Sequence, residues 1–134
     1  MMAAAERVLV VEDDPTLRQI VELSLMARGY RLDVAASGAD ALALIERHPD
    51  LIVLDLGLPD MDGIDLVIQL RTALTTPILV VSARPAGIAQ PAALGAGADD
   101  FLPKPFAIDE PIGRVRALLS QQAPPAGEPG WISA

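Results

Sequence analysis

The residues most able to do chemistry in this sequence are carboxylates that directly follow apolar runs. Asp55 ends an aliphatic stretch that begins at Leu51. Glu12, Asp13 and Asp14 follow another apolar run. Carboxylate oxygens are the ligands that Mg²⁺ prefers, and a carboxylate beside a divalent metal can attack phosphorus. The pattern favours metal-assisted phosphoryl transfer, although Asp55 taken alone is better explained as a turn or helix-capping residue.

Two further side chains could hold a phosphoryl group. Ser82 follows the apolar run 78–81, and Lys104 is the one lysine among ten basic residues. A compact ammonium is not interchangeable with a planar guanidinium, so a single lysine in an arginine-rich chain is a candidate functional residue. The alternative is that this lysine remains by chance. A hydroxyl and an ammonium can each bind one oxygen of an acyl phosphate.

Five short apolar segments predict the strands that position these residues. Continuous aliphatic runs are typical of strands buried on both faces of a parallel sheet. The predicted strands are residues 7–11, 32–35, 51–56, 78–81 and 100–102. Their alternation with helical patterns predicts an α/β fold with a doubly wound parallel sheet of five strands and five helices. In the flavodoxin-like strand order 2-1-3-4-5, the first, third, fourth and fifth strands are neighbours. The carboxylates, Ser82 and Lys104 at their ends would then share one crevice, at the point where the strand order reverses.

The helical segments are less regular than the strands. We predict helices from Pro15 to just before Gly29, from Ser37 to near His48, over 63–74, from near Gln90, and from Asp109 to Gln121. The apolar positions expected to face the core include Ile20, Val21 and Leu25 in the first helix, and Ile64, Val67 and Ile68 in the third. Pro91 would remove a backbone hydrogen bond and clash with the preceding turn, so we expect the fourth helix to be short and to begin late.

Composition limits the functional classes. The 134 residues suit one domain, predicted at 6–121, with a linker-like Pro- and Gly-rich tail at 122–134. The absence of cysteine excludes disulfides and thiolate metal sites. A formal net charge of −8 argues against a nucleic-acid-binding surface. No membrane-length apolar run or signal peptide is recognisable, so we expect a soluble cytoplasmic protein with His48 on its surface.

Four motifs give the chain a family resemblance. They are residues 10–15 (VVEDDP), 54–63 (LDLGLPDMDG), 81–84 (VSAR) and 95–106 (GAGADDFLPKPF). Together they cover about residues 6–120, and in order and spacing they resemble the receiver domain of bacterial two-component response regulators. The resemblance implies the CheY-like version of the predicted fold. It also implies that a sensor histidine kinase donates a phosphoryl group to the domain.

The resemblance assigns roles at the acidic cluster. It implies that Asp55 is the phosphoacceptor, with Mg²⁺ as cofactor. Asp13 would bind the metal directly and Glu12 through water, while Asp55 and the Gly57 carbonyl would complete the protein ligands. The chain would not be an enzyme acting on a separate substrate. It would assist its own phosphorylation and dephosphorylation.

The resemblance also implies how phosphorylation would be read. Ser82 would be the switch hydroxyl and Phe101 its aromatic partner, although Phe101 could equally be core filler. Lys104 would bind the phosphate and precede a cis peptide bond to Pro105, an isomer that a tertiary amide makes accessible. Ala83 would leave room for the phosphodonor. The output would be a changed surface on the fourth helix, fifth strand and fifth helix.

Within the family, segments 54–63 and 99–106 resemble the OmpR/PhoB winged-helix subclass, KdpE-type members in particular. That subclass dimerises through the fourth helix, fifth strand and fifth helix by salt bridges between subunits. Asp100 and Arg114 keep one such pair, but Gln90 replaces the lysine of another, and a proline lies in each helix of the face. We therefore expect a homodimer of this type to be weakened.

Several alternatives stay open. The chain could be a receiver fragment that controls a transcriptional output domain, or a stand-alone receiver that signals through protein contacts. A phosphohydrolase with an aspartyl nucleophile usually needs an acidic residue two positions after it, where this chain has Gly57. A receiver-like module that binds partners without phosphorylation usually lacks one of the acidic, hydroxyl or lysine residues. All of them are present here.

Overall fold

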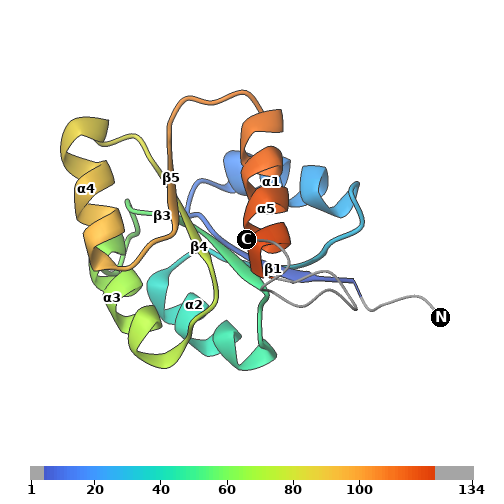
Figure 1. Cartoon of the computed structure of the whole chain (residues 1–134), viewed down its shortest axis with the longest axis horizontal. Helices are drawn as coiled ribbons and strands as arrows, with labels where there is room; N and C mark the ends of the chain where they lie inside the picture. Colours follow the sequence, from blue (N-terminus) through green and yellow to red (C-terminus); the bar gives the residue numbers. More distant parts are fainter. Residues whose placement is uncertain (1–4, 123–134) are drawn as a thin grey trace, which may run out of the picture.

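Strands and helices alternate along the whole described part of the chain, residues 5–122, in a computed structural model (Figure 1). The strands are β1 (Arg7–Val11), β2 (Arg31–Ala35), β3 (Leu51–Asp55), β4 (Ile78–Ser82) and β5 (Asp100–Pro103). The helices are α1 (Pro15–Met26), α2 (Gly38–Leu44), the 3₁₀ turn η1 (Ile45–Arg47), α3 (Gly63–Ala73), α4 (Ala86–Ala96) and α5 (Asp109–Gln122). Apart from Gln122, the predicted tail lies outside the described residues.

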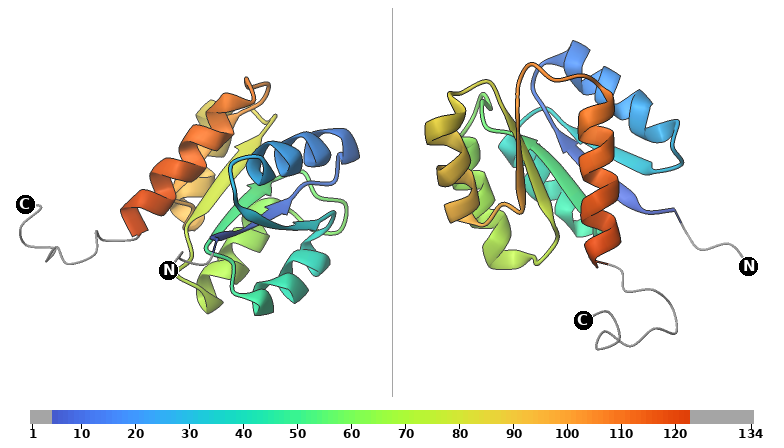
Figure 2. Two further views of the ribbon diagram at one scale, coloured as in Figure 1. Left: turned by 90° about the vertical axis from the view of Figure 1, so that its right-hand side faces the viewer. Right: turned by 45° about the horizontal axis from the view of Figure 1, so that its top comes forward.

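The five strands form one parallel sheet in the order β2-β1-β3-β4-β5, as the alternating pattern predicted. Helices α1 and α5 cover one face, and α2, α3 and α4 cover the other (Figures 1 and 2). Every residue of β3 and β4 is buried. Successive residues of a strand point to opposite faces, which is why these two strands read as unbroken aliphatic runs.

Local capping fixes the first two helices. The Asp14 carboxylate accepts hydrogen bonds from the N–H groups of Thr16 (3.0 Å) and Leu17 (3.4 Å) at the start of α1. The Ser37 hydroxyl accepts a hydrogen bond from Asp40 N at 3.1 Å and caps α2. These side chains satisfy N–H groups that have no partner inside a helix. Helix α1 therefore begins immediately after the end of β1 that carries Glu12 and Asp13, and α2 begins shortly after β2.

The predicted inward faces of α1 and α3 were partly wrong. Val21 is buried, but Ile20 is 46% exposed and Ile68 is 49% exposed. The cause in α3 is Gly63, whose added Cβ would lie only 2.4 Å from the Leu56 Cα. This close approach turns the Gly63 side of the helix toward the sheet. Positions three, four and seven residues later share that side, and Leu66, Val67 and Leu70 are accordingly the buried ones.

The prediction that the fourth helix begins near Gln90 was wrong, because α4 runs from Ala86 and contains Pro91. A proline ring is costly where it meets packed side chains and where a buried carbonyl loses its partner. Pro91 is exposed, and so is Gly87, whose carbonyl lies one turn earlier. Ala89 and Ala93 form the buried side of the helix. The proline thus lies on the side where solvent can satisfy the freed carbonyl. The predicted start of α5 at Asp109 is confirmed.

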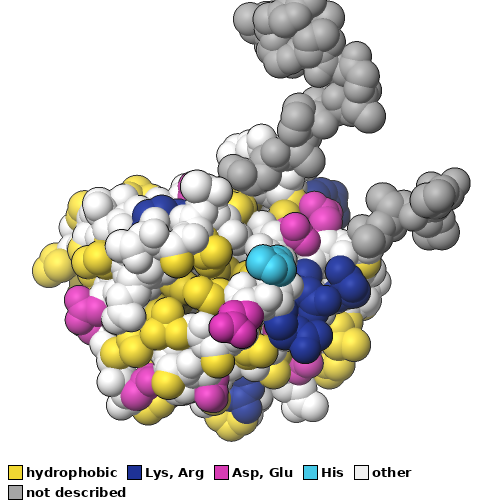
Figure 3. All heavy atoms as spheres, turned by 90° about the horizontal axis from the view of Figure 1, so that it is seen from below, with side chains coloured by type: hydrophobic (Ala, Val, Ile, Leu, Met, Phe, Trp, Pro, Cys, Tyr) yellow, Lys and Arg dark blue, Asp and Glu magenta, His cyan; other side chains and the backbone are white. Residues whose placement is uncertain are grey.

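Both ends of the described chain lie at the amino-terminal edge of the sheet. Strand β1 starts there, and α5 returns antiparallel to the strands, so that Leu119 lines a hollow with Glu6, Asp50 and Pro77. Figure 3 views the molecule from this side, with the single His48 exposed at the surface as predicted. Among the described helices, none is both long and apolar enough to cross a bilayer.

Candidate functional site

The candidate residues meet at the opposite, carboxyl-terminal edge of the sheet. Glu12 follows β1, Asp55 ends β3, Ser82 ends β4 and Lys104 follows β5. The Lys104 ammonium donates to Glu12 Oε1 at 2.8 Å and lies 3.5 Å from Asp55 Oδ2. Residues separated by up to 92 positions are thus in direct contact. The convergence that the strand order predicted is present.

Glu12, Asp13 and Asp55 form an acidic cluster in which one oxygen from each lies within 4.8 Å of the others. Glu12 and Asp55 are only 3% and 6% exposed, whereas Asp13 faces solvent. An added Cβ on Gly57 would lie 3.8 Å from Asp55 Oδ2, so the Gly57 backbone borders the same cluster. Clustered hard oxygen donors with one open side fit a Mg²⁺ ion that retains several waters.

Burial and charge shift the ionisation of the site. Burial raises the pKa of Glu12 to about 7, with a further rise from the Asp55 charge and an opposing effect of the Lys104 hydrogen bond. Burial lowers the pKa of Lys104, but its hydrogen bond to Glu12 and the charge of Asp55 outweigh this and raise it overall. Lys104 is therefore charged at neutral pH. A divalent cation bound among the carboxylates would favour their ionised forms.

Ser82 and Phe101 lie on the same face of the sheet. Phe101 pairs with Val80 in the β4–β5 register, and both belong to the core under α2, α3 and α4. Ser82 is two residues beyond Val80 and therefore points to the same side. Ser82 is 1% exposed and Phe101 3% exposed. The Ser82 hydroxyl accepts a hydrogen bond from the backbone N–H of Arg84 at 3.0 Å.

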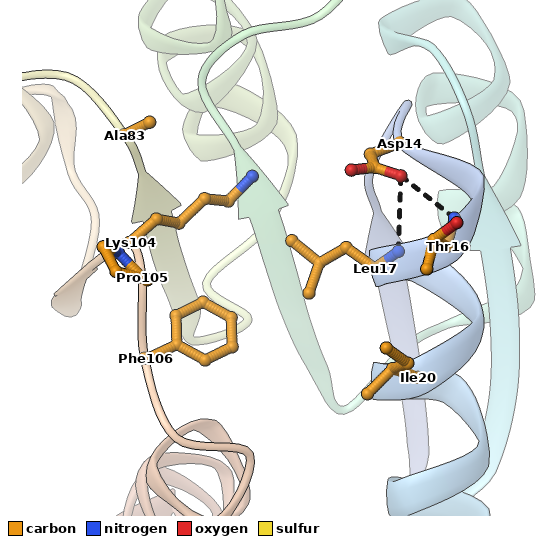
Figure 4. Close-up of a pocket in the computed structure, with 8 residues that line it drawn as sticks. All are labelled: Asp14, Thr16, Leu17, Ile20, Ala83, Lys104, Pro105 and Phe106. Atoms are coloured by element: carbon orange, nitrogen blue, oxygen red, sulfur yellow. Dashed lines mark hydrogen bonds between the residues drawn. The ribbon is translucent and has the colours of Figure 1, made fainter.

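A pocket of about 500 Å³ opens beside Lys104, between α1 and the segment that follows β5 (Figure 4). Phe106 and Leu17 face one another across it, and the Lys104 side chain extends along its upper rim (Figure 4). The lining residues are Asp14, Thr16, Leu17, Ile20, Ala83, Lys104, Pro105 and Phe106. The peptide bond between Lys104 and Pro105 is cis, as the resemblance implied. The exposed Ala83 leaves the approach to the acidic cluster uncrowded.

Sequence reasoning missed the residues that hold the segment between β3 and α3. The Asp60 carboxylate accepts hydrogen bonds from Gly38 N and Ala39 N, both at 2.9 Å, and these bonds lower its pKa. The Arg84 guanidinium binds Asp62 and the Leu56 carbonyl. All three polar residues stand inside or beside the family motifs. Their partners are 21 or more positions away, so local sequence gives no signal for these contacts.

The Asp100–Arg114 pair is made within the chain. Arg114 Nη1 lies 2.8 Å and 2.9 Å from the two carboxylate oxygens of Asp100 and donates to the Phe101 carbonyl at 3.3 Å. The Glu110 carboxylate is also engaged locally, where it accepts from Ala107 N at 3.0 Å. Three charged groups of this face, Asp100, Arg114 and Glu110, are therefore engaged within the monomer.

The family model of the response regulator receiver domain matches residues 8–116. The transcriptional regulatory protein KdpE of Mycobacterium tuberculosis is 47% identical over 113 residues, which are 84% of this chain and 50% of the relative. The response regulator MprA of Mycobacterium leprae is 44% identical over 120 residues, 88% of this chain and 53% of the relative. The chain thus spans about half the length of the curated relatives it matches.

Solved structures agree with the sequence comparison. The receiver domain of the Francisella response regulator 1452 has a TM-score of 0.83 and 37% identity, with 88% of this chain and 99% of that chain covered. The BeF3-activated receiver domain of Klebsiella pneumoniae RstA has a TM-score of 0.81 and 29% identity, with 87% and 100% covered. The chain belongs to the receiver domain family of two-component response regulators.

Proposed function

We propose that Asp55 is the phosphoacceptor of this receiver domain and that Glu12, Asp13, Asp55 and the Gly57 carbonyl hold the Mg²⁺ ion. The observation that carries the proposal is the placement of a buried carboxylate 3.5 Å from the sole lysine, inside a cluster of three carboxylates. Receiver domains are phosphorylated by sensor histidine kinases, and a phosphohistidine is the donor we assign. The domain assists the transfer rather than acting on a separate substrate.

Each residue of the site has a separate role in phosphoryl transfer. An Asp55 oxygen forms the new bond to phosphorus while the bond from phosphorus to the histidine nitrogen breaks. When bound, Mg²⁺ supplies charge neutralisation for the incoming phosphoryl oxygens. Lys104 binds one of these oxygens through its ammonium, and Ser82 donates its hydroxyl hydrogen to another. Phe101 then occupies the space that Ser82 leaves, and the face of α4, β5 and α5 changes.

The test is the mass of the intact protein after incubation with acetyl phosphate and Mg²⁺. We expect the wild type to gain one phosphoryl group and Asp55→Ala to gain none. Asp65→Ala removes an exposed carboxylate from the first turn of α3 and is the matched control, with the same gain as wild type. A wild type that never gains the mass, with or without Mg²⁺, would instead favour a binding module that is not phosphorylated. Rapid turnover of unrelated phosphate esters would favour a phosphohydrolase.

For the longer protein we infer a transcriptional output in the cytoplasm. Support comes from the relatives, one of which is the transcriptional regulatory protein KdpE, and from the match to half of its length. A stand-alone receiver that acts through protein contacts is the second candidate. It is favoured by α4, whose 11 residues carry no charge and therefore offer an apolar contact surface. Reporter expression with the chain alone and with its native downstream sequence would separate the two.

We further infer that a homodimer through α4, β5 and α5 is weak. Arg114 pairs with Asp100 of its own chain, and the uncharged α4 contributes no ion pair to a second copy. Sedimentation of the beryllofluoride-treated protein at tens of micromolar should give a monomer. A stable dimer in that experiment would contradict this inference without affecting the role of Asp55.

A further inference from the structure

The segment between β3 and α3, which carries Gly57, is held by hydrogen bonds between its own two ends. The Leu56 carbonyl oxygen accepts hydrogen bonds from Leu58 N at 3.2 Å and from Gly63 N at 2.9 Å. Gly57 and Asp62 pair across the segment as an isolated antiparallel bridge. Any group that fixes the Leu56 carbonyl also fixes the peptide plane that leads directly into Gly57, because that plane is rigid.

Arg84 is such a group, and it lies two residues after the end of the neighbouring strand β4. Its Nη2 donates to the Leu56 carbonyl at 3.1 Å, and its Nη1 donates to the two Asp62 oxygens at 3.1 Å and 3.4 Å. Asp62 in turn caps α3 by accepting from Ile64 N at 2.9 Å. The guanidinium therefore clamps the segment at both of its ends. A planar fork can do this, whereas a single ammonium cannot reach both partners with the same geometry.

The same residue touches the switch hydroxyl through its backbone. Arg84 N donates to Ser82 Oγ at 3.0 Å. This bond has to break if the hydroxyl turns toward a phosphoryl group on Asp55. Arg84 thus connects the two parts of the site that phosphorylation would move, through its backbone on one side and its side chain on the other.

Stability does not account for this arrangement. The side chains of Arg84 and Asp62 are 41% and 47% exposed. Exposed ion pairs contribute at most about 1 kcal/mol to folding. The segment also contacts α2 independently of Arg84. Asp60 accepts a hydrogen bond from Gly38 N. Met61 packs so closely on Gly38 that an added Cβ there would lie 2.6 Å from Met61 Sδ. The distinctive contribution of Arg84 is therefore the position of Leu56 and Gly57.

We propose that Arg84 is a positioning residue for Mg²⁺: it holds the Leu56–Gly57 peptide, which leads into the residue whose carbonyl would bind the metal. It acts without touching the ion, and it links the metal-binding segment to the Ser82 hydroxyl. The inference rests on the proposed function, because it takes the acidic cluster and Gly57 as the Mg²⁺ ligands.

The test is Mg²⁺ binding to the unphosphorylated protein, with calorimetry for the dissociation constant and the Gly57 amide resonance as the local probe. We expect Arg84→Ala to weaken Mg²⁺ binding about tenfold, as for other residues that orient metal ligands. Arg84→Lys, which keeps the charge near Asp62 but loses the fork, should fall between Arg84→Ala and wild type. The Gly57 resonance should also shift in metal-free Arg84→Ala.

Arg114→Ala is the matched control. Its guanidinium is also 41% exposed and also bonds one carboxylate and one backbone carbonyl, but on β5. We expect the two alanine variants to change the melting temperature equally and only Arg84→Ala to change Mg²⁺ affinity. Equal affinities would overturn the proposal. If Arg84→Ala does not fold, wild-type affinity in Arg84→Lys overturns it instead. A wild type that binds no Mg²⁺ would contradict the proposed function itself and, with it, this inference.

Discussion

Two charged clusters lie toward opposite edges of the sheet and are built in opposite ways. Toward the amino-terminal edge, Arg7 at the start of β1 and Arg47 before β3 bind Asp33, in the middle of β2. The Asp33 carboxylate lies 3.0 Å from Arg7 Nη1 and 3.2 Å from Arg47 Nε. At the carboxyl-terminal edge, three carboxyl groups cluster, and the single ammonium of Lys104 contacts two of them, Glu12 and Asp55. The Asp33 cluster has two cations for one carboxylate, whereas the cluster around Asp55 has one cation for three carboxyl groups.

The difference separates a structural cluster from a functional one. A carboxylate held between two guanidiniums has its charge compensated within the chain, so it has nothing left to bind. Buried carboxyl groups that outnumber their cations repel one another and disfavour their own ionisation. Protonation of Glu12 or the binding of a further cation relieves that cost, and only the cation leaves all three carboxylates ionised. The excess negative charge at the carboxyl-terminal edge is thus itself a reason to assign a metal there.

The largest expected effect comes from exchanging the type of cation in the site. Lys104→Arg should slow phosphorylation by acetyl phosphate, because a planar fork cannot replace a compact ammonium between Glu12 and Asp55. Loss of a charged hydrogen bond corresponds to roughly tenfold to hundredfold. The reverse exchange at the other edge, Arg47→Lys, should leave the rate unchanged. A wild-type phosphorylation rate in Lys104→Arg would contradict a functional role for the sole lysine.

A smaller effect concerns pH in the absence of divalent cations. Folded Glu12 keeps its proton up to a pKa of about 7, whereas in an unfolded chain its pKa is the ordinary 4.5 of a glutamate. Between these values the unfolded state binds fewer protons, so stability falls as pH rises. We expect the free energy of unfolding to drop by on the order of 2 kcal/mol between pH 5 and pH 8.

Glu12→Gln provides the comparison for that measurement, because an amide at the same position cannot ionise. Its denaturant unfolding curve should depend less on pH over the same window. Parallel pH profiles for wild type and variant would show that burial of Glu12 carries no such cost.

The smallest effect is expected at the compensated cluster. Asp33→Asn should lower the free energy of unfolding by about 1 kcal/mol, because it leaves Arg7 and Arg47 without their shared partner. Phosphorylation of Asp55 should be unaffected, since Asp33 lies in the middle of β2 and is not part of the acidic cluster. A loss of phosphorylation in this variant, at a temperature where it is fully folded, would mean that the two edges are coupled.

The sequence allowed most of the fold and the site to be predicted for one physical reason. Strands such as β3 are buried on both faces, so their residues are aliphatic without interruption and their ends are visible where Asp55 begins the loop. A parallel sheet then brings such ends together. The predicted candidate residues that line the acidic cluster needed no further information.

The errors and omissions have a different origin. The start of α4 was misplaced because the cost of Pro91 depends on which side of the helix faces solvent, and only packing decides that. The role of Arg84 was missed because its acceptors, Leu56 and Asp62, belong to another strand connection. Propensity and periodicity describe a segment by itself, whereas both of these features depend on contacts between segments.

The return of α5 to the amino-terminal edge has a practical consequence for experiments. Arg7 and Gln122, which bound the first strand and the last helix, lie at the edge opposite Asp55. A fluorescent reporter fused beyond Gln122 would therefore leave the acidic cluster open to donors. The same layout sets a minimum distance over which a structural change must be transmitted. A change at Asp55 must cross the five residues of a strand, about 16 Å at roughly 3.3 Å per residue, before such a reporter can register it.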